Sequence, residues 1–309
     1  MKKVLLATTA LVATAGASHA EVALSGIAEL GFLVGSDDLD PADGFDESEF
    51  RFHTDIDVTF TLSGTTDNGL TFGATIDLDE SDDGDAFDAD TQGGETIFIS
   101  GNFGSITGGD TDGAFDWALT ELNAGSPGSI DDGETEHDGY SGNAGLDGTY
   151  DGQIIRYEYS FQNFGVAFSA EIDDSGDEDA IFGIGARYGF DFASGTINFG
   201  AGYQDGDSGL EIYGGSISAV LDNGLTATVN YSEGETEDGD FENYGIGLSY
   251  EFDAFSVHGN YANTDTDSGD DDGFGFAAAY DLGGGASVHF GFGTDDTDET
   301  YSFGVAMSF

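Results

Sequence analysis

The chain has 309 residues, of which 62 are acidic and five are lysine or arginine, and its formal net charge is −57. Such a charge argues against nucleic acid as a partner, because phosphates would be repelled. There is no cysteine, so no disulfide stabilises the fold. Strong acidity often accompanies disorder, but the 26 Phe and 13 Tyr predict a folded protein.

The first 20 residues have the pattern of a secretory signal peptide. Lys2 and Lys3 precede a short apolar run at residues 4–17, and the small residues Ser18 and Ala20 stand before Glu21. We therefore expect cleavage after residue 20 and one domain over residues 21–309. Loss of the two lysines leaves three arginines as the basic residues and changes the formal charge from −57 to −59.

Alternation of apolar and polar side chains predicts an all-β protein of about sixteen strands. The last strand is the clearest, with apolar residues at every second position from Tyr301 to Phe309. Residues 97–99 do not alternate, and Gly214 and Gly215 suggest a β-bulge. The predicted strands span residues 22–34, 50–63, 69–79, 94–101, 104–109, 153–162, 165–172, 180–190, 195–204, 210–221, 224–232, 242–252, 255–263, 274–282, 286–293 and 299–309.

The connections between these strands alternate between short turns and long loops. Short turns such as residues 222–223 and 283–285 contain the Asn and Gly that hairpins prefer. The long loops hold most of the acidic residues, and the longest covers about residues 110–152. All short turns would lie at one end of the sheet and all long loops at the other. This polarity is typical of outer-membrane barrels, with short periplasmic turns and long extracellular loops.

The apolar face of the strands is predicted to contact lipid. In the second strand Ile56 and Phe60 share one face, whereas Arg51, Asp55 and Asp57 share the other. A charge on the lipid face near the bilayer midplane costs about 2–4 kcal/mol, which explains this sorting. The opposite arrangement, a soluble sandwich with the apolar face inside, would need larger core residues than the many Gly and Ala here. We therefore predict a transmembrane antiparallel β-barrel with an aqueous lumen.

Several segments resemble outer-membrane porins of the alphaproteobacterial, Rhodobacter type. They read EVALSG at residues 21–26, FTLSGTTDNGLTFGA at 60–74, FISGNFG at 98–104 and YDLGGGAS at 280–287. The terminal Phe309 matches the assembly signal of that family. The resemblance implies a homotrimeric general-diffusion porin in the Gram-negative outer membrane, with its third long loop folded into the lumen.

The resemblance also implies where the pore narrows. The third loop maps to about residues 110–152, and residues 114–121 match the family's inward segment. The expected constriction residues are Asp110, Asp112, Asp116 and Glu121, and the expected basic wall partners are Arg51, Arg156 and Arg187. Relatives carry more basic residues on this wall. Here Glu29, Asp55, Asp57 and Glu158 lie on the same polar face, which weakens the expected transverse field.

The acidity has two interpretations that remain open. It can be a solvated surface adapted to high salt, or it can make an acid-lined pore that selects cations. The expected function is diffusion of ions and small hydrophilic solutes with a preference for cations. The alternative is a secreted, acidic, calcium-binding β-rich surface or adhesive protein.

Calcium and catalysis are the remaining questions. Asp79, Asp83, Asp90, Asp265 and Asp267 have some spacings of an EF-hand loop but no flanking helices. We expect no resident cofactor and only loose calcium binding by the acidic loops. The histidines are scattered, and no nucleophile–base arrangement is recognisable, so we do not expect an enzyme.

Overall fold

The computed structural model describes residues 21–35, 49–79, 94–130, 143–150, 152–173, 179–206, 209–236, 239–267, 269–295 and 299–309. The predicted signal peptide lies outside these residues, as do the calcium candidates Asp83 and Asp90.

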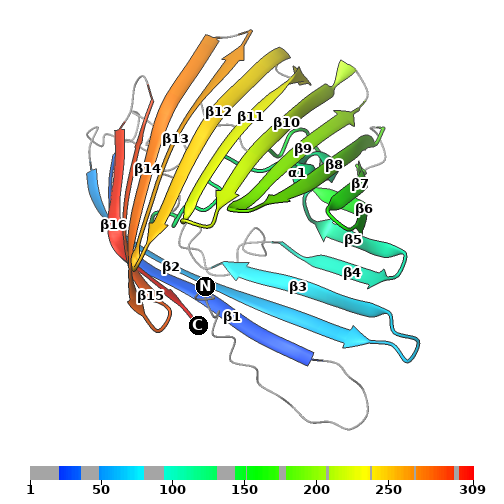
Figure 1. The fold of residues 1–309 in the computed structure, drawn as a ribbon, viewed down its shortest axis with the longest axis horizontal. Coiled ribbons are helices and arrows are strands. Elements are labelled where there is room, and N and C mark those ends of the chain that lie inside the picture. Colours follow the sequence, from blue (N-terminus) through cyan, green and yellow to red (C-terminus); the bar gives the residue numbers. More distant parts are fainter. Residues whose placement is uncertain are drawn as a thin grey trace.

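Sixteen antiparallel strands form one closed barrel, in which each strand pairs with its neighbours in sequence and β1 pairs with β16 (Figure 1). This confirms the predicted fold class. The strands are β1 (Glu21–Gly35), β2 (Glu49–Thr65), β3 (Thr71–Asp79), β4 (Thr96–Gly101), β5 (Gly104–Asp110), β6 (Gln153–Phe161), β7 (Phe164–Glu171), β8 (Ile181–Phe192), β9 (Gly195–Asp205), β10 (Glu211–Leu221), β11 (Leu225–Thr236), β12 (Gly239–Phe252), β13 (Phe255–Thr266), β14 (Gly269–Gly283), β15 (Ala286–Thr294) and β16 (Glu299–Ser308).

The two faces of the barrel differ as the alternation predicts. Large apolar side chains such as Ile246 and Leu248 are exposed on the outside, whereas Ser249 and His258 are buried on the inside. Near one short turn, Tyr250, Phe252 and Phe255 stack with ring centroids 5.5 and 5.4 Å apart. Aromatic residues at this level are typical of the girdle at a membrane interface. Among the described residues, no helix is long and apolar enough to cross a membrane.

Three details differ from the sequence prediction or add to it. Gly214 and Gly215 pair regularly with β9 and β11, so the predicted bulge is wrong; a register shift occurs instead between Asp281 and Gly283. β11 and β14 extend beyond the predicted ends into acidic segments, because backbone pairing continues past the apolar positions. In β4, Phe98 faces inward and covers Gly73, where an added Cβ would lie 2.5 Å from its ring.

The described parts of the third long loop, residues 111–130, 143–150 and 152, lie inside the barrel, as expected. Its first part forms the short helix α1 (Ala114–Ala118), which packs against β7, β8 and β9 (Figure 1). Phe115 and Trp117 of α1 are buried together with Ile181 and Ile212 of the wall. A small apolar core therefore fills one side of the lumen and fixes the position of the loop.

Candidate functional site

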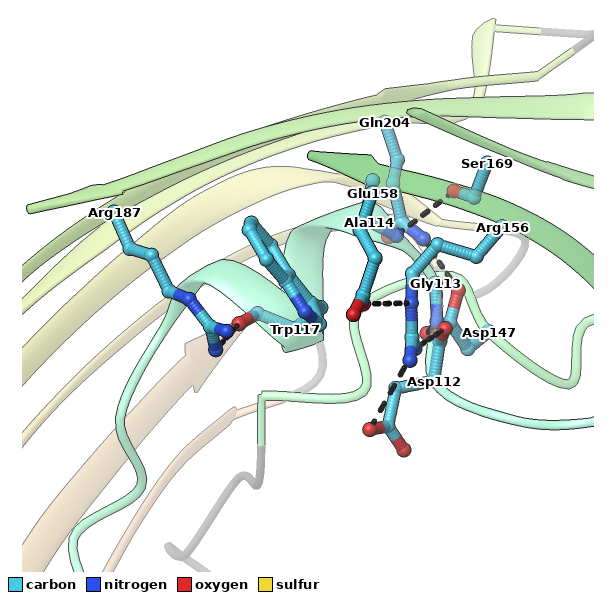
Figure 2. A network of polar contacts seen from close by, with 10 residues as sticks. All are labelled: Asp112, Gly113, Ala114, Trp117, Asp147, Arg156, Glu158, Ser169, Arg187 and Gln204. Atoms are coloured by element: carbon cyan, nitrogen blue, oxygen red, sulfur yellow. Dashed lines mark hydrogen bonds and ion pairs between the residues drawn. The ribbon is translucent and has the colours of Figure 1, made fainter. Parts of the chain in front are cut away.

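Arg156 on β6 binds the start of the loop. Its Nη1 donates to the carbonyl oxygen of Asp112 and lies 3.8 Å from the Asp112 carboxylate, and its Nε lies 3.3 Å from Glu158 (Figure 2). The arginine is buried, whereas the Asp112 side chain is 64% exposed. The single positive charge of Arg156 is thus shared between two carboxylates.

Arg187 on β8 binds the end of α1. Its guanidinium carbon lies 3.8 Å from the centre of the Trp117 ring, and Nη1 donates to the Trp117 carbonyl oxygen at 3.3 Å (Figure 2). A cation–π contact of this kind is worth about 0.5–2 kcal/mol, depending on how far it is desolvated. Arg187 therefore holds the helix against the wall.

The returning part of the loop is bound by two carboxylates. Asp147 accepts hydrogen bonds from the Gly113 amide at 2.5 Å and from the Gln204 side-chain amide at 2.6 Å. Glu171, which is buried at the end of β7, accepts from the backbone N–H groups of Gly148, Tyr150 and Gly152 at 3.0–3.1 Å. These bonds join both arms of the loop to β7 and β9.

From α1 onward, residues 114–130 of the loop follow the inner wall as far as β16. Polar side chains that project inward from the strands bind its backbone. The contacts are Ser169 Oγ with the Ala114 amide at 2.8 Å, Ser216 Oγ with the Thr120 amide at 2.7 Å, Ser249 Oγ with the Ala124 carbonyl at 2.8 Å, His289 Nδ1 with the Gly128 carbonyl at 3.0 Å, and Ser302 Oγ with the Ile130 amide at 3.3 Å.

The loop carboxylates lie close enough to influence one another. Burial, together with the negative charges of Asp112, Glu121 and Asp147, raises the pKa of Asp116 to about 7, against the opposing effect of Arg156. Burial likewise raises the pKa of Asp147 to about 6, although its two hydrogen bonds act in the other direction. The charge at this part of the lumen therefore changes near neutral pH.

The four expected constriction residues do not all meet. Asp112 and Asp116 lie at α1, and Glu121 follows it and accepts a hydrogen bond from the Asn143 amide at 3.1 Å. Asp110 ends β5 opposite Gln153, on the face that also carries the exposed Ile155. The register therefore places Asp110 on the outer face, apart from the other three.

The expected wall residues fall into two groups. Arg156, Glu158 and Arg187 lie beside the loop, on β6 and β8. Arg51, Asp55 and Asp57 lie on β2, and Asp55 pairs with Glu29 of β1. Glu29 is also 3.8 Å from His53 Nε2. The β1–β2 wall thus carries three carboxylates on its inner face.

The remaining predicted sites are a metal site and the chain end. Within the described ranges, no three His, Asp or Glu residues are placed to hold a metal ion. Asp265 pairs with Glu242 and Asp270 on neighbouring strands, Asp267 lies just beyond β13, and Asp79 ends β3. Phe309 donates its amide to the Gly26 carbonyl at 2.9 Å, and its side chain is exposed.

Sequence reasoning missed the residues that bind the loop. Asp147, Glu171 and Gln204 form no motif, because their partners are distant in sequence. A weak signal existed in the Gly-x-Gly pairs at 183–185, 200–202 and 245–247, which lie on the polar strand face. In the structure these glycines lie directly under the loop.

A closed barrel of sixteen strands, apolar outside and polar inside, with a loop packed in its lumen, is a transmembrane β-barrel channel. A family model described as Gram-negative porin matches residues 7–300, and the chain belongs to this family. It is 30% identical to a porin of Rhodobacter capsulatus over 94% of this chain and all of that protein.

Solved structures agree with the sequence comparison. A porin refined at 1.8 Å resolution matches 94% of this chain and all of its own, with a TM-score of 0.69 and 26% identity. A substituted porin of Rhodopseudomonas blastica matches 93% of this chain with a TM-score of 0.70 at 21% identity, which supports the fold. The chain is therefore an outer-membrane diffusion channel, and nothing in these comparisons supports the secreted calcium-binding alternative.

Proposed function

We propose that this porin passes small hydrophilic solutes by diffusion and prefers cations. The observation that carries the proposal is the group of carboxylates at α1, where Asp112, Glu121 and Asp147 act electrostatically on Asp116. Arg156 is already shared between Asp112 and Glu158, and Arg187 is engaged by Trp117. Because the loop narrows the lumen here, uncompensated negative charge would favour cations in passage.

The carboxylates of the β1–β2 wall support the same proposal. Glu29, Asp55 and Asp57 add negative charge to the inner face. At 1 M salt the Debye length is about 3 Å, so distant extracellular charges would be screened and only charges near the path of the ion would select. We also propose that three copies assemble into a homotrimer, as the resemblance to Rhodobacter-type porins implies.

Planar-bilayer recording tests the proposal directly. The detergent-purified protein should insert in steps of uniform conductance, and under a KCl gradient its reversal potential should have the sign of a cation-preferring pore. Replacing Glu121 with Gln should reduce this preference, whereas Asp222→Asn in a short turn should not. A reversal potential near zero or of the opposite sign would reject cation selectivity while leaving the channel itself in place. Light scattering of the detergent complex would give the number of subunits.

A further inference from the structure

Glycines on the inner wall lie directly beneath α1. Gly185 on β8 and Gly202 on β9 face each other in register, and Gly200 lies nearby on β9. A Cβ at Gly185 would lie 1.9 Å from the Ala114 carbonyl oxygen, and one at Gly200 would lie 2.1 Å from the Ala118 carbonyl oxygen. We call Gly185, Gly200 and Gly202 the α1 seat. No side chain other than hydrogen fits there.

A second pair of glycines lies beneath Leu122. A Cβ at Gly247 on β12 would lie 1.8 Å from the Leu122 carbonyl oxygen, and one at Gly245 would lie 2.3 Å from Leu122 Cδ1. We call Gly245 and Gly247 the Leu122 seat. Neither Gly185 nor Gly247 has a positive φ, so close approach, rather than backbone conformation, accounts for glycine at these positions.

A third pair lies where the barrel closes. Gly31 of β1 and Gly304 of β16 pair directly, and the fully buried Ile130 covers both. Cβ atoms at these two positions would lie 3.0 and 2.9 Å from the Ile130 side chain. The loop thus touches glycines at three widely separated points on the wall.

We propose that the α1 seat and the Leu122 seat set the width of the pore, by letting the loop lie flush against the wall. This rests on the proposed diffusion through the lumen. Each wall strand is hydrogen-bonded on both sides and cannot retreat, whereas the loop is held by side chains such as Ser216 and Ser249. An added methyl group would therefore move the loop toward the lumen axis.

The size of the displacement follows from the contacts. Side-chain carbons do not approach other atoms closer than 3.0 Å, so a methyl group 1.8–1.9 Å from a loop carbonyl requires a shift of more than 1 Å. The well-packed interior transmits such a shift rather than absorbing it. Gly185→Ala and Gly247→Ala should each give single-channel conductance about 1.5-fold lower, together with a smaller size limit for sugars in liposome swelling.

Gly189→Ala is the matched control. Gly189 lies on the same strand and face as Gly185, but its added Cβ would meet Asn198 and Thr196 at ordinary distances of 3.4 and 3.8 Å. Its conductance and sugar limit should equal those of the unaltered protein. If Gly185→Ala and Gly247→Ala barrels also conduct like the unaltered protein, or if Gly189→Ala lowers conductance equally, the proposal is wrong.

A milder pair of substitutions decides the question if those variants do not fold. Gly245→Ala presses mainly on the Leu122 side chain, so it should lower conductance, and Leu122→Ala in the same chain should restore it. Equal conductance of Gly245→Ala and the double variant would overturn the proposal. Failure of diffusion itself would look different, because the unaltered protein would then form no channels.

Discussion

Asp116 is a side chain whose charge changes near neutral pH. Its raised pKa of about 7 means that it is neutral in acid and negative in mild base. Cation preference should therefore increase from about pH 5 to about pH 8, with Asp147 contributing at the lower end of the change. Reversal potentials under a KCl gradient, recorded at several pH values in this range, measure the change in cation preference.

The variant Asp116→Asn separates this effect from general titration of the surface. Its cation preference should rise with pH only through the titration of Asp147 near pH 6 and should stay below that of the unaltered protein at pH 8, whereas Asp222→Asn should titrate as the unaltered protein does. A pH profile that Asp116→Asn leaves unchanged would remove Asp116 from the mechanism. The same pKa shift makes the stability of the packed loop depend on pH. Because the pKa of Asp116 in the folded protein exceeds the usual value of 3.8, the stabilisation by protonated Asp116 is fully present below about pH 4 and is lost as the pH rises through about 7.

Arg156 has both an electrostatic and a structural role, and two substitutions distinguish them. Arg156→Ala removes a positive charge beside Asp112 and Glu158, so cation preference should rise. At about 10 Å from a permeating ion and an effective dielectric constant of about 20, one charge contributes about 1.7 kcal/mol, so the permeability to cations should rise by up to about 17-fold at low salt. The midpoint of the Asp116 titration should also move upward, because Arg156 lowers the pKa of Asp116.

Arg156→Lys keeps the charge but cannot contact Asp112 and Glu158 at the same time from a planar group. Its selectivity should stay close to that of the unaltered protein, while the start of the loop becomes less well held. Arg156→Ala with unaltered selectivity would show that this arginine does not act on permeating ions.

At the scale of elements, the returning arm of the loop depends on Glu171. Its carboxylate accepts three backbone N–H bonds, from Gly148, Tyr150 and Gly152. Glu171→Gln replaces one acceptor oxygen with an NH2 group that faces those donors, and should destabilise the local structure by about 2–4 kcal/mol. Hydrogen exchange at residues 148–152 should quicken, with Glu158→Gln as the control, because that carboxylate contacts Arg156 instead. Unchanged protection would contradict this role.

Most strands could be predicted because they carry their own alternation of apolar and polar residues. The alternation along Tyr301–Phe309 or Ile56–Leu62 indicates which face contacts lipid. The short turns indicate which strands are neighbours, and the alternation of short turns with long loops places them at opposite ends of the barrel. The exceptions were positions where local composition misleads: two adjacent glycines at 214–215 pair regularly, and the acidic ends of β11 and β14 still form ladders.

The path of the loop could not be predicted, for a physical reason. Its contacts join residues far apart in the chain, such as Thr120 with Ser216 and Ile130 with Ser302, and no local pattern records them. The resemblance supplied the loop and its acidic segment, and Asp112 and Asp116 lie there, but register places Asp110 elsewhere. The glycine pairs at 200–202 and 245–247 carry no local signal of the loop's path either, because the segment that covers them is distant in sequence.

At the scale of the whole molecule, the extracellular ends of β10–β13 bring like charges together. Glu235 pairs with both Glu211 and Asp240, and Glu242 pairs with both Glu233 and Asp265. Carboxylates directly opposite one another on neighbouring strands repel. On a chain of such high net charge, counter-ions that screen this repulsion should stabilise the pairing of these strands.

The barrel should therefore be less stable at low salt, and the effect should be traceable to these ladders. Melting of the detergent-solubilised protein should occur at a lower temperature in about 0.05 M than in about 1 M NaCl, because the Debye length shortens from more than 10 Å to about 3 Å. Glu235→Gln removes two repulsive pairs at once. At low salt it should increase the free energy of unfolding by about 0.2–1 kcal/mol per pair and so raise the melting temperature. Its effect should vanish at 1 M, and Asp222→Asn, which removes the same charge from a short turn, should do less. A melting temperature independent of salt would mean that the acidic surface is solvated without strain, and would leave selectivity near α1 as the main consequence of the acidity of this chain.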